Sequence, residues 1–597
     1  MLYDCMQVFM EEVRRVQTES IRLDTDTDLE YENKYVIDNY IPKEGMHILI
    51  YIDNGFKVEE PLNISIDAKK GEIIGQVDSR YQYIRYLDYN SKLVAMNKPI
   101  KNKKIHSNNM YSFFVKQDSV LKGEVTEKIV DEYYDSLAKK EKKYTNRYSK
   151  ELYRQAEKEI GVINLDNLEK IRNWVKEWVR NPSKLPYELT GKDYLKLFFV
   201  YQNEKNTKEI YEKENRRYIL PNIYNNNEYN LKVNNEVVGL PNNNRSFNSK
   251  KSFLQNKTRK TITPYLVSMN EVIWQNRFFD YLYGRACIGK VNIYFDFDEQ
   301  KIRAIADKGD DPDHIESGLY LRIRKGKEVE ILDSNVVIAL NPNLEDTFYY
   351  RSILEGKDDN VSQRECNTRS QLAAVIDEVF FGKMLTYNFF TVPEKLSITD
   401  SVVKNVLLTY RDRLFEWFYR NPKCDMQQLL EEMSMKLVQN SIQNGFHNRA
   451  RQQLNLMLSL QDYMKRDTRM EEMMEMVQEQ FKKYIDMNQE EWKFENDMEY
   501  YYAVGQLVDY FLSLSKAAKK PFSLAGQFIA AKDDAMIKEN LLKLIEKYSH
   551  AIDRDKDVRA KNIISHVMLY TPQTKVQQQY LMAGLMSNNA FYMKKEN

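Results

Sequence analysis

The spacing of apolar residues changes along the chain from a strand-like to a helical pattern. Segments 46–53, 72–78 and 81–88 are rich in β-branched and aromatic residues and are bounded by glycine or aspartate, which predicts short strands. From residue 126 onward apolar residues recur every three to four positions, as they also do in segment 164–177. This period places them on one face of a helix and predicts two helices there.

The second half of the chain repeats this order of elements. Alternating apolar patterns predict four further strands, at 291–298, 301–307, 318–326 and 335–340. After residue 391 nearly every segment keeps an apolar stripe at helical spacing, most clearly at 426–440, 470–487, 500–520 and 533–552. The fold class is therefore expected to be α+β, with a mixed α/β N-terminal body followed by an all-α helical-bundle C-terminal domain.

Three regions follow from these patterns. A strand-rich N-terminal region spans 1–125, a mixed α+β region spans 126–395, and the helical bundle spans 396–597. Within the middle region, segment 218–265 is rich in asparagine, contains prolines and lacks periodicity, which predicts a long loop. A loop of this length inside a compact chain is usually either functional or disordered.

Net charge gives no indication of a partner. The 597 residues include 89 lysines and arginines and 88 aspartates and glutamates, for a formal net charge of +1. Only local clusters of lysine and arginine can therefore indicate nucleic-acid binding. The four cysteines are scattered singly, without the spacing of a disulfide framework or a zinc site. We expect no metal, no cofactor and a reducing compartment.

The hydropathy of the chain predicts neither a membrane span nor a signal sequence. The N-terminal segment carries acidic and basic side chains within its first turns. No stretch of the sequence approaches the ~20 apolar residues that a membrane-spanning helix requires. We therefore expect a soluble, cytoplasmic protein without a membrane partner.

The first local concentration of positive charge precedes an aromatic pair, Phe113 and Phe114. Four of its lysines have no acidic neighbour between residues 88 and 118 of the sequence, namely Lys98, Lys101, Lys103 and Lys104. Such lysines can neutralise phosphates, and His106, Asn108 and Asn109 offer hydrogen-bonding groups for bases or sugars. The aromatic pair either stacks on an unpaired base or anchors the cluster in the fold. The alternative is a solvated basic turn that leads into a buried strand.

A second basic segment, 245–260, lies in the expected loop. Its basic residues are not accompanied by any acidic residue: Arg245, Lys250, Lys251, Lys257, Arg259 and Lys260. Asn248 lies at an expected tight turn, where its amide can read a base edge. Phe247 and Phe253 alternate with the basic residues, which suits a nucleic-acid interface. The alternative is a polar loop without a ligand.

Two patterns in the sequence could indicate an enzyme. Four aspartates surround His314 in segment 307–316 and could bind a metal, but the glycine and proline inside it favour a turn between two strands. Arg559 and His566 have a spacing used by one family of helical ribonucleases. That family usually has a polar residue after the arginine, whereas this chain has Ala560. Phosphate-binding, nucleophile-elbow and zinc-protease motifs are absent from the sequence, so we expect no catalytic residue.

Four segments together resemble a known protein family. They are KKIHSNNMYSFFVK (103–116), FNSKKSFLQNKTRK (247–260), YYYAVGQLVDYFLSLSKAAKKPFSL (500–524) and YLMAGLMSNNAFY (580–592). In this order they are similar to the large subunit of the type I-B CRISPR interference complex, Cascade, and more narrowly to the Csh-type branch of the Cas-eight family. Some members carry paired cysteines in the middle loop. This chain has asparagines there, so the resemblance does not extend to a zinc module.

The resemblance implies an antiviral defence complex in which a guide RNA pairs with target DNA. The large subunit reads the short flanking motif, the PAM, on the DNA duplex and steadies the opened strands. Its implied partners are guide RNA, target DNA, backbone subunits, a handle-binding subunit and a recruited helicase-nuclease. Segment 245–260 is then the expected motif reader. The helical domain resembles the small subunit of related complexes and would hold the displaced strand through Lys516, Lys519 and Lys520.

Two other functions stay open beside this one. The chain could be a stand-alone single-stranded nucleic-acid-binding or scaffold protein, or a ribonuclease that acts through Arg559 and His566. We also expect the helical domain to be made separately by internal translation, from a start near Met470. The core of that fragment is expected to contain Leu507, Val508, Phe511, Leu541, Leu542, Leu544, Ile545, Ile563, Ile564 and Leu569.

Overall fold

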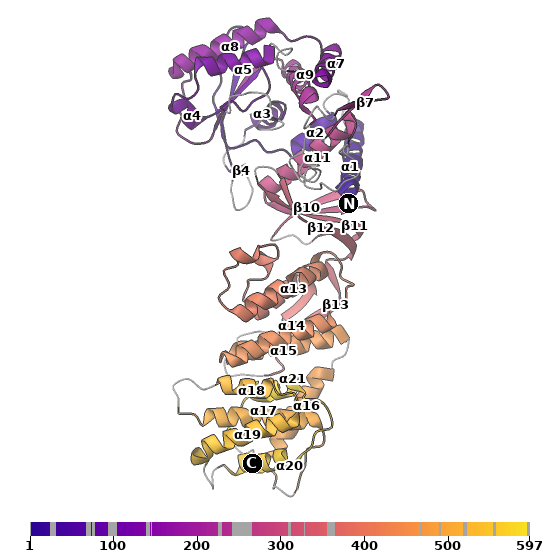
Figure 1. Cartoon of the computed structure of the whole chain (residues 1–597), viewed down its shortest axis with the longest axis vertical. Coiled ribbons are helices and arrows are strands. Elements are labelled where there is room, and N and C mark those ends of the chain that lie inside the picture. The colour runs from indigo at the N-terminus through magenta and orange to yellow at the C-terminus, as the bar shows by residue number, and fades with distance from the viewer. Residues whose placement is uncertain are drawn as a thin grey trace. The chain divides into compact units, whose positions relative to one another are not determined.

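The chain forms two compact units, which are described separately below (Figure 1). The first comprises Met1–Asp310 and Gly318–Val336, and the second comprises Asp311–Ser317 and Val337–Asn597. The computed structural model describes residues 2–23, 31–66, 73–74, 78–93, 104–138, 144, 146–224, 230–240, 266–307, 312–326, 329–354, 364–465, 469–488, 491–516, 522–552 and 557–593. Strands and helices are mixed in the first unit and helices dominate the second, so the expected α+β class is confirmed.

A six-stranded sheet forms the centre of the first unit. Its strands are β1 (Gly45–Tyr51), β2 (Lys57–Val58), β3 (Leu62–Ile66), β4 (Ile73–Ile74), β5 (Ser112–Lys116) and β6 (Tyr194–Val200). They are ordered β4-β3-β1-β6-β5, with β2 paired to β1, and only the β1–β6 pair is parallel. Every residue of β6 is buried, which is expected for a strand covered on both faces.

Helices cover both faces of this sheet. On one face lie α5 (Glu127–Ala138) and α8 (Leu165–Arg180), and the Trp174 ring of α8 packs 5.5 Å from Phe199 of β6. On the other face lies α3 (Arg80–Tyr89), whose Asp88 contacts Lys196 of β6. The remaining longer helices of the unit are α1 (Leu2–Leu23), α2 (Tyr31–Asp38), α7 (Arg147–Ile160), α9 (Glu204–Asn222) and α11 (Met269–Cys287).

A second sheet belongs mainly to the first unit. It is ordered β10-β9-β11-β12 and contains β9 (Lys290–Asp296), β10 (Lys301–Ala306), β11 (Ile315–Lys325) and β12 (Val329–Leu340). The four strands predicted from the sequence between 291 and 340 are thereby confirmed. One hydrophobic cluster contains buried residues from Cys5 to Val329, and a smaller cluster forms around Leu152 and Tyr224.

The larger cluster corrects the expected boundary at residues 125 and 126. Strand β5 lies before that boundary and pairs along its whole length with β6, which lies after it. A domain boundary crosses few contacts, whereas this one would cut through a sheet. The sequence pattern changes there because helices follow the strands along the chain. Strands and helices can share one hydrophobic core, so a change of element does not mark a domain boundary.

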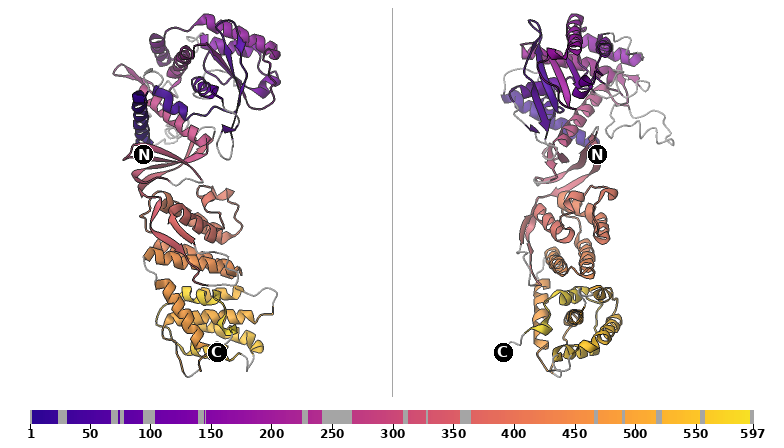
Figure 2. Two further views of the ribbon diagram at one scale, coloured as in Figure 1. Left: turned by 180° about the vertical axis from the view of Figure 1, so that it is seen from behind. Right: turned by 90° about the vertical axis from the view of Figure 1, so that its left-hand side faces the viewer.

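The second unit begins with two paired strands, β13 (Asn343–Tyr350) and β14 (Arg364–Thr368), and continues as helices. These are α12 (Arg369–Phe381), α13 (Ser401–Tyr419), α14 (Gln427–Gln443), α15 (His447–Lys465), α16 (Arg469–Tyr484), α17 (Asp497–Ser513), α18 (Gly526–Ile529), α19 (Asp534–Tyr548), α20 (Val558–Leu569) and α21 (Gln578–Met586). Figure 2 shows them from two further sides. The expected helical bundle is confirmed, although the unit begins near residue 337 rather than at 396.

Helix α17 is the central element of this bundle, because nearly all of its residues are buried around its whole circumference. It carries Leu507, Val508 and Phe511 of the core expected for a C-terminal fragment. Leu542 and Leu569, which were expected in the same core, are 56% and 82% exposed. Both lie on the outer faces of their helices, where an apolar residue does not need a partner.

Two further sequence predictions fail in the first unit. Segment 81–88 was expected to be a strand and is helix α3. Its aromatic and β-branched residues reflect burial on most sides, and burial alone does not distinguish a short strand from a buried helix. The expected loop 218–265 contains a hairpin of β7 (Leu231–Val233) and β8 (Glu236–Val238). Asn234 and Asn235 form its turn with φ angles of 48° and 68°, a conformation that asparagine tolerates.

Candidate nucleic-acid interface

The two asparagines of the first basic cluster lie in the interior, which corrects the expectation that they contact a ligand. Asn108 is 1% exposed and donates to the carbonyl oxygen of Lys92 at 2.6 Å and to Oδ1 of Asn215 at 3.2 Å. Asn109 is fully buried and donates to the carbonyl oxygens of Asn90 and Tyr211 at 3.2 and 3.1 Å. Buried amides require such partners. These two side chains therefore fix the loop before β5 to the fold.

The aromatic residues after them also belong to the core. Phe113 is fully buried and packs edge-on against Trp178, with ring centres 6.3 Å apart. Phe114 is 2% exposed and packs edge-on against Phe198 at 5.2 Å. Of the two roles considered for this pair, the structure supports anchoring and leaves neither ring accessible to a base.

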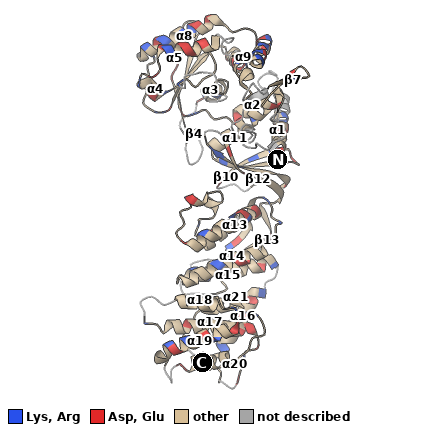
Figure 3. Ribbon diagram, viewed as in Figure 1, with Lys and Arg blue, Asp and Glu red and all other residues tan. Residues whose placement is uncertain are grey.

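Of the four lysines of the cluster, only Lys104 lies within the described residues, and Lys98, Lys101 and Lys103 lie outside them. The ammonium group of Lys104 forms an exposed ion pair with Glu124. This partner is twenty residues away in the sequence and could not be recognised from the neighbours of Lys104. Figure 3 shows a similar mixture of basic and acidic residues along the helices of both units. An ion pair leaves less of the lysine charge available for a phosphate.

His106 lies with Lys43 and Lys116 around the ring of Tyr194. We call these four residues the Tyr194 patch. The ammonium groups of Lys116 and Lys43 lie 3.8 and 5.5 Å from the centre of the Tyr194 ring. The His106 ring stands perpendicular to it at 5.4 Å. Cations at these distances are attracted by the ring face.

Strand pairing brings the patch together. Lys116 lies directly opposite Tyr194 in the antiparallel pair of β5 and β6, and Gly45 lies opposite Tyr194 in the parallel pair of β1 and β6. Lys43 precedes Gly45 by two residues. The φ angle of Gly45 is +140°, and a Cβ atom there would lie 2.1 Å from the carbonyl oxygen of Tyr194. Only glycine permits this close approach of the two strands.

Burial and neighbouring positive charges keep the imidazole of His106 neutral at neutral pH. Burial, together with the charges of Lys43, Lys116 and Lys196, lowers the pKa of His106 to about 4. Burial likewise lowers the pKa of Lys116, while Asp193 acts in the opposite direction. The Tyr194 patch thus presents two lysines and a neutral imidazole, and an approaching negative charge would raise the pKa of that imidazole.

A buried charge network lies beneath the patch. Lys196 and Asp88 form an ion pair in which both side chains are at most 3% exposed. Tyr40 donates to Oδ1 of Asp88 at 3.1 Å, and Nε2 of His47 lies 3.5 Å from Oδ2. Burial by itself would raise the pKa of Asp88, but the Lys196 ammonium and the contacts with His47 together outweigh it and hold that pKa below its usual value. The network connects β1, β6 and α3 and is inaccessible to a ligand.

The other basic residues expected at the interface are mostly outside the described residues. The whole second segment lies outside the described residues, which includes Arg245, Asn248, Lys250, Lys251, Lys257, Arg259 and Lys260. Lys519 and Lys520 also lie outside them. Lys516 is exposed just beyond the end of α17. Sequence reasoning missed Lys43 and Lys116, since each stands apart from the basic runs and only the strand register brings them together.

The residues considered for catalysis make structural contacts. His566 lies between the carbonyl oxygens of Asn562 and Trp492, at 2.9 and 3.0 Å from its ring nitrogens, and stacks on the Trp492 ring at 3.8 Å. Arg559 forms an ion pair with Asp486 at 2.6 Å. His314 is exposed, 3.6 Å from Glu316. Within the described ranges, histidine, cysteine and acidic side chains nowhere gather in a group that could hold a metal.

Comparisons with known proteins identified no similar protein. No family model matches the sequence, and neither a curated protein nor a solved structure is significantly similar to it. Among the helices of the described residues, none combines the length and apolar character needed to cross a membrane.

Proposed function

We propose that this chain is the non-catalytic large subunit of an RNA-guided DNA-surveillance complex of the type I-B CRISPR kind. The observation that carries the proposal is the ordered resemblance of four sequence segments, from residue 103 to residue 592. The architecture agrees with what that resemblance implies, because a mixed α/β unit is followed by a helical unit. Guide RNA, target DNA, backbone subunits, a handle-binding subunit and a recruited helicase-nuclease are its proposed partners.

The Tyr194 patch is the proposed contact for a nucleic-acid backbone. Lys43 and Lys116 supply positive charge without an ion pair in the described part of the chain, whereas Lys104 shares its charge with Glu124. Tyr194 is only 8% exposed, so the patch offers charge and no free ring for stacking. Such a surface neutralises phosphates without reading the sequence. Base-specific reading of the flanking motif is assigned to Asn248 and Lys250 in segment 245–260.

Co-purification tests the proposed function. The chain is expressed from its native gene neighbourhood, and the proteins and RNA that elute with it are identified. Repeated backbone subunits together with a short RNA of uniform length are expected. If the chain elutes alone and binds single strands of any sequence without a guide, the stand-alone binding protein is the correct function instead.

Binding measurements then test the Tyr194 patch. Replacing Lys43 and Lys116 by alanine is expected to weaken DNA binding of the assembled complex for all sequences alike. The slope of log affinity against log salt should fall by roughly 0.7–0.9 for each lysine that contacts a phosphate. The matched control replaces Lys158 and Lys170, two exposed helix lysines of the same unit, by alanine. Equal salt slopes for the patch variant and the control would contradict the assignment.

A further inference from the structure

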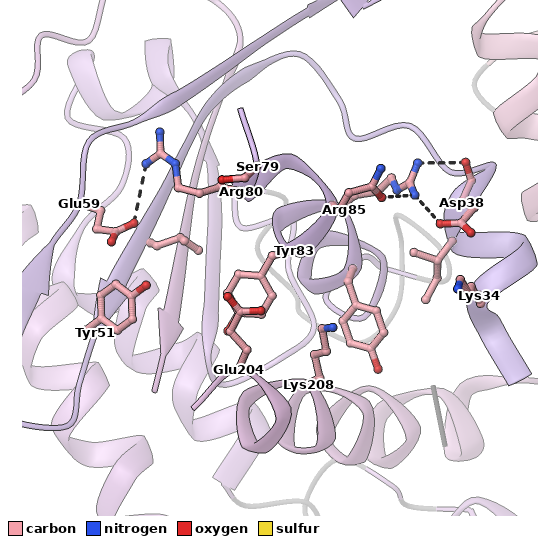
Figure 4. A pocket seen from close by; sticks show the side chains of 14 residues that line it. Lys34, Asp38, Tyr51, Glu59, Ser79, Arg80, Tyr83, Arg85, Glu204 and Lys208 are labelled. Atoms are coloured by element: carbon pink, nitrogen blue, oxygen red, sulfur yellow. Dashed lines mark hydrogen bonds and ion pairs between the residues drawn. The ribbon is translucent and has the colours of Figure 1, made fainter. Parts of the chain in front are cut away.

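A pocket of about 390 Å³ lies in the first unit between α3, α9, β1 and the end of α2 (Figure 4). Glu59 and Glu204 both line it. Several of its charged side chains are bound to one another: Glu59 lies 3.7 Å from Arg80, and Arg85 donates to Oδ1 of Asp38. Those groups are not available to a ligand. One edge of the second sheet, in contrast, has backbone groups that a further strand can reach.

Strand β12 forms this edge. Its only neighbour among the described strands is β11, and the two run antiparallel because residues 326–328 alone join them. Residues 330–336 of β12 belong to the first unit. Leu332 and Val336 project from the exposed face of this stretch and are 39% and 46% exposed. The alternate residues face the interior, where Ile331 packs against the larger hydrophobic cluster.

Three alternate backbone N–H groups of β12 have acceptors outside β11. Those of Ser334 and Val336 donate to Oδ1 of the residue before each, at 2.8 and 2.9 Å. That of Ile338 donates to the carbonyl oxygen of Arg420 at 2.9 Å. In an antiparallel pair, alternate residues turn their N–H and C=O groups to opposite sides of the strand. The even-numbered residues of β12 therefore present theirs on its outer edge.

At the opposite edge of this sheet, and at one edge of the first sheet, the chain covers its own strands. At β10 the N–H group of Ile302 donates to Glu12 of α1. At β5 the N–H group of His106 donates to the carbonyl oxygen of Phe114 at 2.8 Å. Exposed edges that lack such a cover usually carry lysine or proline, which discourage pairing with another strand. Residues 329–340 contain neither. The edge of β12 is thus suited to strand addition.

We propose that the outer edge of β12 pairs with the same edge of a second copy of this chain. The two strands run antiparallel about a two-fold axis through Ser334. Leu332 of each copy then lies opposite Val336 of the other, and the second sheet continues across the axis. The contact does not depend on the proposed function, because it needs neither nucleic acid nor another kind of subunit.

A second copy is favoured because the edge is complementary to itself in this register. On the exposed face, Leu332 and Val336 form apolar cross-strand pairs, and such pairs stabilise a sheet. On the other face, Asp333 of each copy lies opposite Asn335, so that a carboxylate meets an amide. The two Asp333 side chains are only diagonal neighbours. A two-fold axis makes each of these contacts twice.

Neighbouring registers fit less well. An axis through Leu332 would leave Val336 without an apolar partner. An axis through Val336 would require the N–H group of Ile338 to leave the carbonyl oxygen of Arg420. With the axis at Ser334 the paired stretch ends where Arg420 already occupies the edge, so no existing hydrogen bond has to break.

The interface is small, and we therefore expect a weak dimer. A pair of short strands buries less than the roughly 1,200 Å² at which stable interfaces begin, so Kd should be on the order of 10–100 μM. Sedimentation equilibrium of the full chain, purified without nucleic acid or other subunits, measures it between about 1 and 200 μM. A monomer at the lowest concentration and a dimer at the highest are expected. A chain that stays monomeric throughout, or that forms species larger than a dimer, would overturn the proposal.

Two matched pairs of variants locate the contact. Ser334→Pro removes an outward N–H group at a position where an edge strand tolerates proline, and should raise Kd at least tenfold. Ser334→Ala keeps that N–H group and should leave Kd unchanged. Val336→Lys places a charge on the edge and should also raise Kd at least tenfold. Its control is Val233→Lys, which changes an exposed valine of another strand of the same unit.

The register predicts one variant that strengthens the dimer. Asp333→Asn removes the diagonal repulsion between the two copies, so Kd should fall. Circular dichroism checks that each variant keeps its fold. A dimer that survives both Ser334→Pro and Val336→Lys would overturn the assignment to β12. So would protection of the β12 amides from hydrogen exchange only in the assembled complex, because another subunit would then cover this edge.

Discussion

At the scale of single residues, the buried pair of Asp88 and Lys196 connects the central sheet to α3. Removing one partner of such a pair leaves an uncompensated charge in the interior. We expect Asp88→Asn to lower the free energy of unfolding of the first unit by about 3–5 kcal/mol. The double variant Asp88→Leu, Lys196→Met should lose much less, because no charge stays buried alone. Urea unfolding measures both, and an equal loss in the two variants would contradict this account.

His106 provides a pH-dependent prediction at the same scale. Its pKa is about 4 in the folded chain, against an ordinary value near 6.5 in the unfolded chain. The unfolded state therefore binds more protons in this interval, and stability should fall as pH decreases from 6.5 to 4, by on the order of 2 kcal/mol. His106→Asn should remove this part of the pH dependence. Thermal unfolding of both proteins across that interval measures the difference, and parallel curves would show that His106 does not contribute.

At the scale of elements, two glycines set the distance between α17 and α21. A Cβ atom on Gly584 would lie 2.0 Å from the carbonyl oxygen of Tyr502, and one on Gly505 would lie 2.1 Å from that of Leu581. Such distances force the helices apart, and overpacking of this kind typically costs about 1–3 kcal/mol. Gly584→Ala should therefore destabilise the second unit by at least this amount. Gly526→Ala is the control, since its new methyl group meets only the flexible side chain of Gln443 at 3.4 Å.

At the scale of the whole molecule, the chain divides into two compact units, and we expect them to unfold in separate transitions. Asp88→Asn is expected to shift only the transition of the first unit, and Gly584→Ala only that of the second. Scanning calorimetry of the full chain measures both shifts. A single transition that moves in response to either substitution would show that the units unfold together.

The extent of the second unit also bears on the expected fragment that starts near Met470. Such a fragment keeps α16 to α21 but loses α15, in which Leu454 to Gln461 are all buried. Arg451 of α15 donates from Nε to the carbonyl oxygen of Met586 in α21 at 3.2 Å. We expect a fragment that begins before α15 to be more stable than one that begins at Met470. Thermal unfolding of the two fragments compares them.

Much of the fold was predictable because it depends on neighbouring residues. The apolar stripes at 426–440, 470–487, 500–520 and 533–552 predicted helices that the structure contains, since one-sided burial leaves a period in the sequence. Segment 81–88 failed for the same reason, because α3 is buried on most sides and shows no period. The boundary at 125 and 126 failed because a core can continue through a change of element.

The candidate sites depended on contacts between residues that are distant in the sequence. By itself the sequence determined the class of fold, several of the helices and strands, and the presence of His106 and Lys104 in a basic segment. Only the tertiary structure decided that Asn108 and Asn109 are interior, that Lys116 faces Tyr194, and that Glu59 and Glu204 share a pocket. The physical reason is that periodicity records how a residue and its near neighbours are buried. Strand register and helix packing decide which charged side chains come into contact. Both depend on the sum of many weak contacts along the whole chain.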